Sequence, residues 1–136
     1  MNILIMAAGA VGGYFGSVLS KTNEVTFIAR SEHLEKIQKD GLSVKSVTSG
    51  TFVCKSKAYG SPPPRYKADL VIFCVKEYQN QKACEVISNA VTDHTTILTL
   101  QNGLGSGDIL SRAFGREKII LGAVSYTHLR AHETDS

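Results

Sequence analysis

The amino-acid sequence predicts an α/β domain with a doubly wound, mostly parallel β-sheet. Short apolar segments rich in β-forming residues alternate with segments whose apolar residues recur at helical spacing. Residues 69–75 (DLVIFCV) are almost entirely apolar, which is typical of a parallel strand with both faces covered. A glycine-rich turn separates the first apolar segment from the first helical pattern. Alternation of this kind places helices on both faces of one sheet.

The first unit of the chain is a strand, a helix and a second strand. Residues 2–7 (NILIMA) form an apolar, β-prone run that leads into the glycine-rich turn. Residues 11–21 carry apolar side chains at spacings of three and four, which predicts a helix. Residues 24–28 (EVTFI) predict the next strand. A βαβ unit of this length is expected to have a right-handed crossover.

The second helix is predicted to begin at Ser31, because a serine hydroxyl caps a helix N-terminus well. Leu34 and Ile37 supply its apolar side. Gly41 is expected to end it, since glycine adopts the backbone conformations that stop a helix.

The middle of the chain is less regular. Residues 42–47 and 51–55 are short β-prone runs around a Thr-Ser-Gly turn, which predicts a hairpin. Residues 60–66 contain three consecutive prolines, which cannot join a central strand. This segment is therefore expected to be an extended surface loop.

The alternation resumes in the last third of the chain. Residues 69–75 predict a buried strand, 79–91 a helix, 95–100 a strand, 108–114 a short helix and 118–123 a final strand. A helix separates each strand from the next, so the strands are expected to lie parallel in the same sheet.

Length, composition and charge fit one globular domain. The chain has 136 residues, of which 43% are hydrophobic and 20% charged. The formal net charge of 15 − 12 = +3 is too small to indicate a nucleic-acid partner. No apolar run approaches the roughly 20 residues of a membrane span. Residues 1–8 lack a basic start and predict a first strand, not a signal peptide.

The cysteines are Cys54, Cys74 and Cys84, an odd number without a C-x-x-C pair. This spacing argues against a disulfide framework and against a zinc site. Cys74 is expected to be a small core residue, and Cys84 lacks the basic neighbour of a nucleophilic cysteine. Free thiols suit a reducing, cytoplasmic location.

Residues 124–134 (VSYTHLRAHET) show no clear periodicity. The string resembles a transposon-type sequencing adapter translated in one of its frames. We therefore expect the native domain to comprise residues 1–123 and residues 124–136 to be a non-native tail. His128 and His132 have the i, i+4 spacing of a helical metal pair, but because they lie in this tail we assign them no function.

The glycine-rich turn matches most of a dinucleotide-binding fingerprint, G-x-G-x-x-G, with Ala7 in place of the first glycine. Gly9 would let the backbone approach a diphosphate, and Gly12 would let the helix pack closely on the strand. The helix N-terminus offers free N–H groups and partial positive charge to the phosphates. The predicted cofactor-binding residues here are Ala7, Ala8, Gly9, Ala10, Val11 and Gly12. The alternative is a tight turn that binds nothing.

Arg30 follows the second predicted strand, where an NAD enzyme usually has a carboxylate that holds the ribose hydroxyls. A guanidinium pairs with a 2′-phosphate through two hydrogen bonds and stacks on adenine, whereas a carboxylate repels that phosphate. We therefore predict NADP(H) as the cofactor rather than NAD(H). The alternative is a solvated surface arginine.

Lys76 and Asn102 come just after the strands predicted at residues 69–75 and 95–100. Ligands of open α/β sheets bind beyond the carboxyl ends of the strands, so both side chains are expected to meet the cofactor or a substrate. The alternatives are a solvated lysine and a simple Asn-Gly turn. His33 lies at the exposed start of the second helix and is expected to be a surface residue.

The chain resembles the N-terminal domain of the ketopantoate reductase (2-dehydropantoate 2-reductase) family. The matching segments are AAGAVGGYFG, FIAR with the following helix and DGL, ADLVIFCVKEYQ, and LQNGLG. Together they extend over essentially all of residues 1–123. The resemblance implies a Rossmann-like domain that holds NADPH for the reduction of 2-dehydropantoate to pantoate, in pantothenate and coenzyme A biosynthesis. It also implies that Arg30, Lys76 and Asn102 bind the cofactor and that Asn102 contacts the 2-oxo acid substrate.

The sequence departs from this family in two respects. Ala7 replaces the usual first glycine. The resemblance also implies a helical C-terminal domain that supplies the catalytic general-acid lysine, and we expect this chain to lack that domain. A ketone that accepts hydride needs a proton donor near its oxygen, so we expect this fragment to be inactive alone. The full-length enzyme is expected to act on a small-molecule 2-oxo acid and to form a homodimer, without a nucleic-acid or membrane partner. The alternatives are a reductase of another 2-oxo acid and a non-catalytic nucleotide-binding module.

Overall fold

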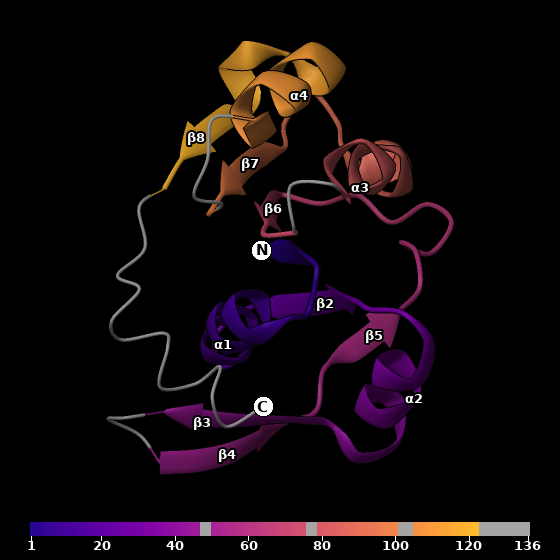
Figure 1. The fold of residues 1–136 in the computed structure, drawn as a ribbon, viewed down its shortest axis with the longest axis vertical. Helices are drawn as coiled ribbons and strands as arrows, with labels where there is room; N and C mark the ends of the chain where they lie inside the picture. Colours follow the sequence, from indigo (N-terminus) through magenta and orange to yellow (C-terminus); the bar gives the residue numbers. More distant parts are fainter. Residues whose placement is uncertain (47–49, 76–78, 101–104, 123–136) are drawn as a thin grey trace.

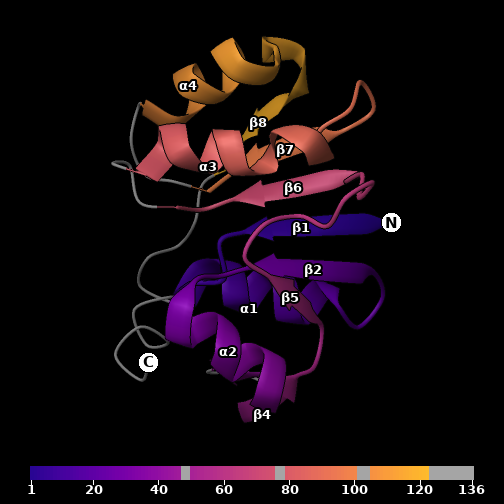
Figure 2. The same cartoon turned by 90° about the vertical axis from the view of Figure 1, so that its right-hand side faces the viewer.

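A parallel six-stranded sheet, in the order β5-β2-β1-β6-β7-β8, forms the centre of the described structure. The structure is a computed structural model that describes residues 1–46, 50–75, 79–100 and 105–122. Every neighbouring pair in this sheet is parallel, and Figure 2 shows the strands in this order from bottom to top. The strands are β1 (Asn2–Met6), β2 (Glu24–Ile28), β5 (Lys57–Tyr59), β6 (Leu70–Phe73), β7 (Thr96–Thr99) and β8 (Ile119–Leu121). The predicted doubly wound α/β fold is confirmed.

Helices cover both faces of the sheet, and the predicted antiparallel hairpin forms beside it (Figure 1). The helices are α1 (Ala10–Leu19), α2 (Ser31–Asp40), α3 (Asn80–Ile87) and α4 (Gly105–Phe114), with short 3₁₀ turns η2 (Ser88–Ala90) and η3 (Arg116–Lys118). The hairpin consists of β3 (Leu42–Ser46) and β4 (Gly50–Cys54). It lies against α1, on the side of the molecule away from β8.

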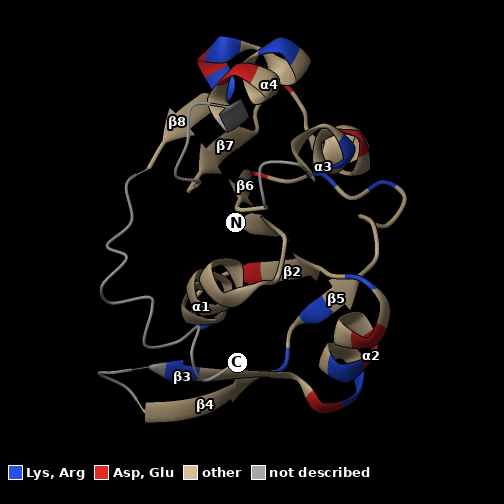
Figure 3. Ribbon diagram, viewed as in Figure 1, with Lys and Arg blue, Asp and Glu red and all other residues tan. Residues whose placement is uncertain are grey.

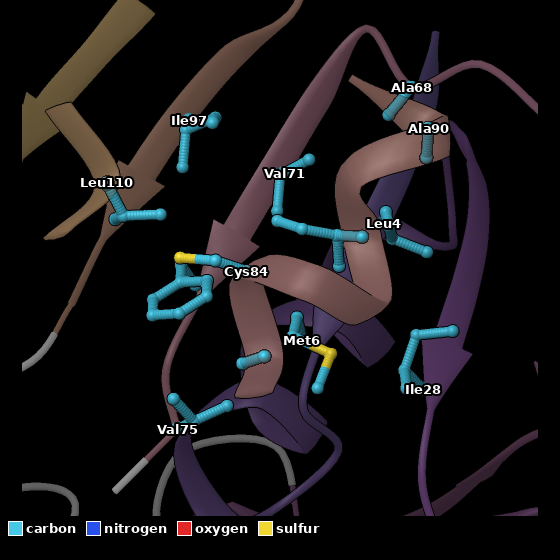
Figure 4. Close-up of a cluster of buried hydrophobic side chains, with 13 residues drawn as sticks. Leu4, Met6, Ile28, Ala68, Val71, Val75, Cys84, Ala90, Ile97 and Leu110 are labelled. Carbon is cyan, nitrogen blue, oxygen red and sulfur yellow. The ribbon is translucent and has the colours of Figure 1, made fainter. Parts of the chain in front are cut away.

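The two faces of the sheet bury alternate residues of each strand. Leu4 and Met6 of β1 join a cluster with α3 and α4, which is shown in Figure 4. Ile3 and Ile5 point the other way and join a cluster with residues of α1, α2 and the hairpin. Because successive side chains of a strand point to opposite faces, a strand with two covered faces is expected to be mostly apolar. This explains the continuous apolar runs in the sequence.

Helix α1 approaches the sheet so closely that two of its glycines leave no room for a side chain. A Cβ atom on Gly12 would lie 2.1 Å from the Ala7 carbonyl oxygen and 2.8 Å from Cys74 Sγ. A Cβ atom on Gly16 would lie 2.5 Å from the ring of the buried Phe27. The role predicted for Gly12 in helix-on-strand packing is therefore confirmed.

Some predicted details are wrong. Ser31 is the first helical residue, with φ of 54°, and not the N-cap. The N-cap is Arg30, whose backbone is still extended like that of the preceding strand. No side chain makes a capping hydrogen bond to the helix N-terminus. Helix α4 begins three residues earlier than residue 108, at Gly105, because glycine in its first turn does not prevent helix formation.

The last strand also starts later than predicted, and one strand was not predicted. The turn η3 takes up Lys118, so β8 begins at Ile119. Strand β5 (Lys57–Tyr59) has only three residues. It is a strand because its backbone pairs with β2, and its sequence alone is too short to predict this. The predicted non-native tail, residues 124–136, lies outside the described residues.

The close approach of α1 predicts the effect of replacing its glycines. We expect Gly12→Ala to lower the free energy of unfolding by about 3 kcal/mol, because the new methyl group meets the Ala7 carbonyl, a backbone atom that cannot move aside. Gly9→Ala is the control, since a Cβ there has no atom within 4 Å and φ is −85°. It should change stability by less than about 1 kcal/mol. Urea unfolding of both variants measures the difference, and equal stabilities would contradict this packing.

Candidate functional site

The segments that follow β1, β2 and β6 meet at the carboxyl edge of the sheet. Backbone hydrogen bonds continue past the strand ends and hold these segments together. The Ala8 N–H donates to the Ile28 carbonyl at 2.9 Å, and the Cys74 N–H donates to the Met6 carbonyl at 2.6 Å. On the outer side, the Ala29 N–H donates to the Tyr59 carbonyl at 3.1 Å. Because the strands are parallel, all their outgoing loops lie along this one edge.

A cavity of about 280 Å³ opens at this edge, between the glycine loop, the end of β2 and the start of α3. Its size is near the lower end of the range for small-molecule sites. The glycine loop contributes Ala7, Ala8 and Gly9, and the segment after β2 contributes Arg30. The structure therefore brings together the turn and the arginine that the sequence singled out separately.

The cavity combines positive charge with an apolar floor. Arg30 lies on one wall, and Lys82 of α3 contributes to the lining from another element. Among the described residues that line this cavity there is no Asp or Glu. Ile28, Val75 and Val86 supply apolar surface. The described lining therefore suits a ligand that has an anionic group beside a flat apolar one.

Sequence reasoning did not single out Lys82 or Gln79, both of which line the cavity. The signal was present in the topology. A helix that directly follows a parallel strand begins at the carboxyl edge of the sheet, so its first turn faces the ligand region. Gln79 is the N-cap of α3, and Lys82 lies in the helix's first turn.

The N-terminus of α1 borders the same cavity through Gly9, which is the helix N-cap. No acidic residue lies in the first turn of α1, and the helix has no charged side chain (Figure 3). The N–H groups of a helix's first turn have no partner within the helix. Together with the open space at Gly9, these groups form an uncompensated, partly positive end at the glycine loop.

The remaining residues of the predicted loop have different positions. A second cavity of about 300 Å³ lies between the glycine loop, Tyr14 and strand β3, and Ala10 is part of its lining. Val11 and Gly12 belong to the first turn of α1, and Gly12 is buried against β1. Ala8 and Gly9 line both cavities.

His33 has a contact that its exposed position did not suggest. The side chain extends from the first turn of α2 to the glycine loop, where Nε2 lies 2.5 Å from the Ala8 carbonyl oxygen. The residue is exposed, as expected for a helix start, yet it also lines both cavities. His33 therefore belongs to the site and is not a surface residue without contacts.

Two predicted site residues, Lys76 and Asn102, lie outside the described residues. Within the described ranges no group of three or more His, Cys, Asp or Glu side chains could hold a metal ion. None of the helices described is long and apolar enough to cross a membrane.

Burial suppresses the acidity of two thiols of the chain. Desolvation raises the pKa of Cys74 to about 12, although a hydrogen bond from Sγ to the Ala7 carbonyl acts in the opposite direction. Desolvation, with a smaller contribution from the Glu85 charge, raises the pKa of Cys84 to about 11. Neither thiol is a thiolate near neutral pH, so neither is a nucleophile. The predicted structural role of both cysteines agrees with these pKa values.

The sequence of this chain is similar to a family of reductases. A family model described as ketopantoate reductase PanE/ApbA matches residues 3–134. A 2-dehydropantoate 2-reductase from Pyrococcus horikoshii is 37% identical over 117 residues, which are 85% of this chain and 38% of that protein. A 2-dehydropantoate 2-reductase from Halobacterium salinarum is 30% identical over 128 residues, which are 93% of this chain and 42% of that protein.

Solved structures of similar proteins have the same fold. A 2-dehydropantoate 2-reductase from Geobacter metallireducens superposes with a TM-score of 0.80 at 37% identity, covering 89% of this chain and 40% of that one. D-mandelate dehydrogenase, in a ternary structure with NADH and anilino(oxo)acetate, superposes with a TM-score of 0.83 at 30% identity. That match covers 90% of this chain and 40% of the dehydrogenase. The chain thus spans about two fifths of the length of these relatives.

The raised thiol pKa values predict slow alkylation. At pH 8 the thiolate fraction of Cys74 should be about a thousandfold lower in the folded chain than in the unfolded one, because its pKa rises from 9.0 to about 12. Iodoacetamide labelling with and without urea, followed by mass spectrometry of each cysteine peptide, measures this ratio. Since the unfolded thiol loses its proton first, stability should also fall as the pH rises from about 9 to about 12. Equal labelling rates in both states would contradict the raised pKa of Cys74.

Proposed function

The chain belongs to the ketopantoate reductase PanE/ApbA family, and from that premise we propose that it is the NADP(H)-binding part of a 2-dehydropantoate 2-reductase. The complete enzyme would reduce 2-dehydropantoate to pantoate with NADPH. The observation that carries the proposal is the cavity at the carboxyl edge of the sheet, where the glycine loop, Arg30 and Lys82 lie together without a lining carboxylate among the described residues.

The glycine loop is proposed to hold the diphosphate. Gly9 has no atom within 4 Å of the place where its Cβ would be, so a phosphate can approach the backbone there. The first-turn N–H groups of Ala10, Val11 and Gly12 would donate to the phosphate oxygens. Ala7 replaces the usual first glycine at the end of the strand, and the loop still forms the cavity border.

The adenosine half of the cofactor is proposed to occupy the 280 Å³ cavity. The apolar side chains of Ile28, Val75 and Val86 would pack on the adenine. Arg30 would pair with the 2′-phosphate through its planar guanidinium, and Lys82 would add a second positive charge. An NAD(H)-specific site would need a carboxylate for the ribose hydroxyls, and the described lining has none.

Catalysis is proposed to depend on further residues as well. NADPH supplies a hydride when it is bound. Lys76 and Asn102 are proposed to bind the cofactor, and Asn102 is also proposed to orient the 2-oxo acid. The developing negative charge on the ketone oxygen needs a proton donor. Because this chain spans about two fifths of its relatives, we propose that the missing remainder of the protein supplies the donor, a lysine.

A second candidate function is the reduction of another 2-oxo acid. The similarity to D-mandelate dehydrogenase favours this candidate, because that enzyme was solved with NADH and anilino(oxo)acetate. The same fold can thus serve a different acid and the other dinucleotide. A non-catalytic nucleotide-binding module is the remaining alternative, and it would bind the cofactor without turnover.

The location, the partners and the native extent of the domain stay predictions or proposals. A cytoplasmic location stays a prediction, supported by Cys54, Cys74 and Cys84, which are all free thiols. A homodimer of the full-length enzyme and the absence of a nucleic-acid partner also stay predictions. We further propose that the native domain is residues 1–123 and that residues 124–136 are a non-native tail.

Cofactor selectivity tests the role of Arg30. The chain should bind NADPH at least about tenfold more tightly than NADH, because a hydrogen-bonded charge pair contributes about 1.5–3 kcal/mol. Arg30→Glu should abolish that preference, since the carboxylate repels the 2′-phosphate. Lys39→Glu makes the same charge change in the last turn of α2, outside the cavity lining, and serves as the control. Calorimetric titration of each variant measures the ratio. An unchanged ratio in Arg30→Glu would remove Arg30 from the site.

Substrate choice is tested on the complete protein. With NADPH, kcat/KM should be higher for 2-dehydropantoate than for benzoylformate, the 2-oxo acid related to mandelate. Steady-state rates at equal enzyme concentration give the comparison. The opposite order would support the second candidate function, and binding without any turnover would support the non-catalytic module.

A further inference from the structure

The glycine loop forms a thin partition between two cavities. Ala8, Gly9 and His33 are the described residues that line both the 280 Å³ cavity and the 300 Å³ cavity. Within this partition, His33 Nε2 lies 2.5 Å from the Ala8 carbonyl oxygen. A carbonyl oxygen only accepts hydrogen bonds, so Nε2 carries the hydrogen and donates it.

We infer that His33 is a positioning residue that fixes the glycine loop for cofactor binding. The inference rests on the proposed function of the same site. The Nε2–H group holds the Ala8 carbonyl and thereby orients the peptide that joins Ala8 to Gly9. His33 acts through the loop and not on the cofactor itself, because its donor atom is already engaged by Ala8.

Both backbone polar groups of Ala8, the N–H and the carbonyl, form hydrogen bonds. Its N–H donates to the Ile28 carbonyl at 2.9 Å, and its carbonyl accepts from His33. The first bond continues the backbone pairing of the two strands, whereas the second depends on one side chain. Gly9, the next residue, donates its N–H to the Ala7 carbonyl at 2.9 Å, and a Cβ atom on its open side would have no atom within 4 Å. Glycine also has the widest conformational freedom of any residue. Without His33, the Ala8–Gly9 peptide therefore has fewer restraints.

A loop that is fixed before binding costs less entropy when it meets the diphosphate. The bond from His33 also links this loop to the segment that carries Arg30, since both residues lie at the start of α2. Loss of the bond should weaken the binding of NADPH and NADH by the same factor, because both share the diphosphate. This effect differs from that of Arg30, which should change the ratio of the two affinities.

The experiment compares three substitutions of His33 by titration with NADPH and NADH. His33→Gln places an amide N–H close to the position of Nε2, whereas His33→Asn is too short and His33→Leu has no donor. We expect Asn and Leu to weaken both nucleotides about fivefold and Gln to stay within about twofold of the unsubstituted chain. Lys36→Leu, an exposed position of α2 outside both cavity linings, is the matched control.

Amide hydrogen exchange gives a second readout that needs no ligand. The Gly9 and Ala10 N–H groups should exchange faster in His33→Leu than in His33→Gln, while urea unfolding shows that both variants remain folded. Unchanged affinities and exchange in His33→Leu, or equal weakening by Gln and Leu, would overturn the inference. A loss confined to NADPH would overturn it too, because His33 would then contact the 2′-phosphate. If the unsubstituted chain binds neither nucleotide, the proposed function fails, and hydrogen exchange still tests the role of His33.

Discussion

The contact between α1 and β1 at Gly12 is the constraint on which the rest of the site depends. A side chain at this position would lie 2.1 Å from the Ala7 carbonyl oxygen, so only glycine lets the helix begin where it does. Gly16 repeats the same close approach one turn later, against Phe27. The N-terminus of α1 is thereby placed directly at the carboxyl end of the first strand. A helix held farther from the sheet would direct its free N–H groups away from the cavity edge.

The segment between β2 and α2 connects the two sides of the proposed cofactor site. Arg30 caps the helix in an extended conformation and lines the cavity. His33, in the first turn of the same helix, contacts the Ala8 carbonyl. The backbone bond from Ala8 to the Ile28 carbonyl fixes the spacing between the segment and the loop. Groups proposed to recognise the 2′-phosphate and the diphosphate are therefore held in one short, hydrogen-bonded unit.

Most of the fold could be predicted from the sequence because the buried positions of helices and strands are apolar residues at regular spacings. The strand of residues 24–28 has the predicted bounds, and its four buried residues form a continuous apolar or small run. Strand β5 could not be predicted, since three residues with a lysine at their start become a strand only through pairing with β2. The residue type of Ser31 predicts it as the N-cap, but the N-cap is Arg30, one residue earlier.

The candidate site was predictable to the extent that it is local in sequence. The glycine loop and Arg30 follow strands directly, so topology alone brings them to one edge. Lys82 and His33 were missed because each lies on an exposed helix position, and their proximity to the cavity arises from how the helices pack. If cofactor choice rests on a few side chains at the cavity rim, those side chains can change without disturbing the apolar core. The same fold would then serve either dinucleotide.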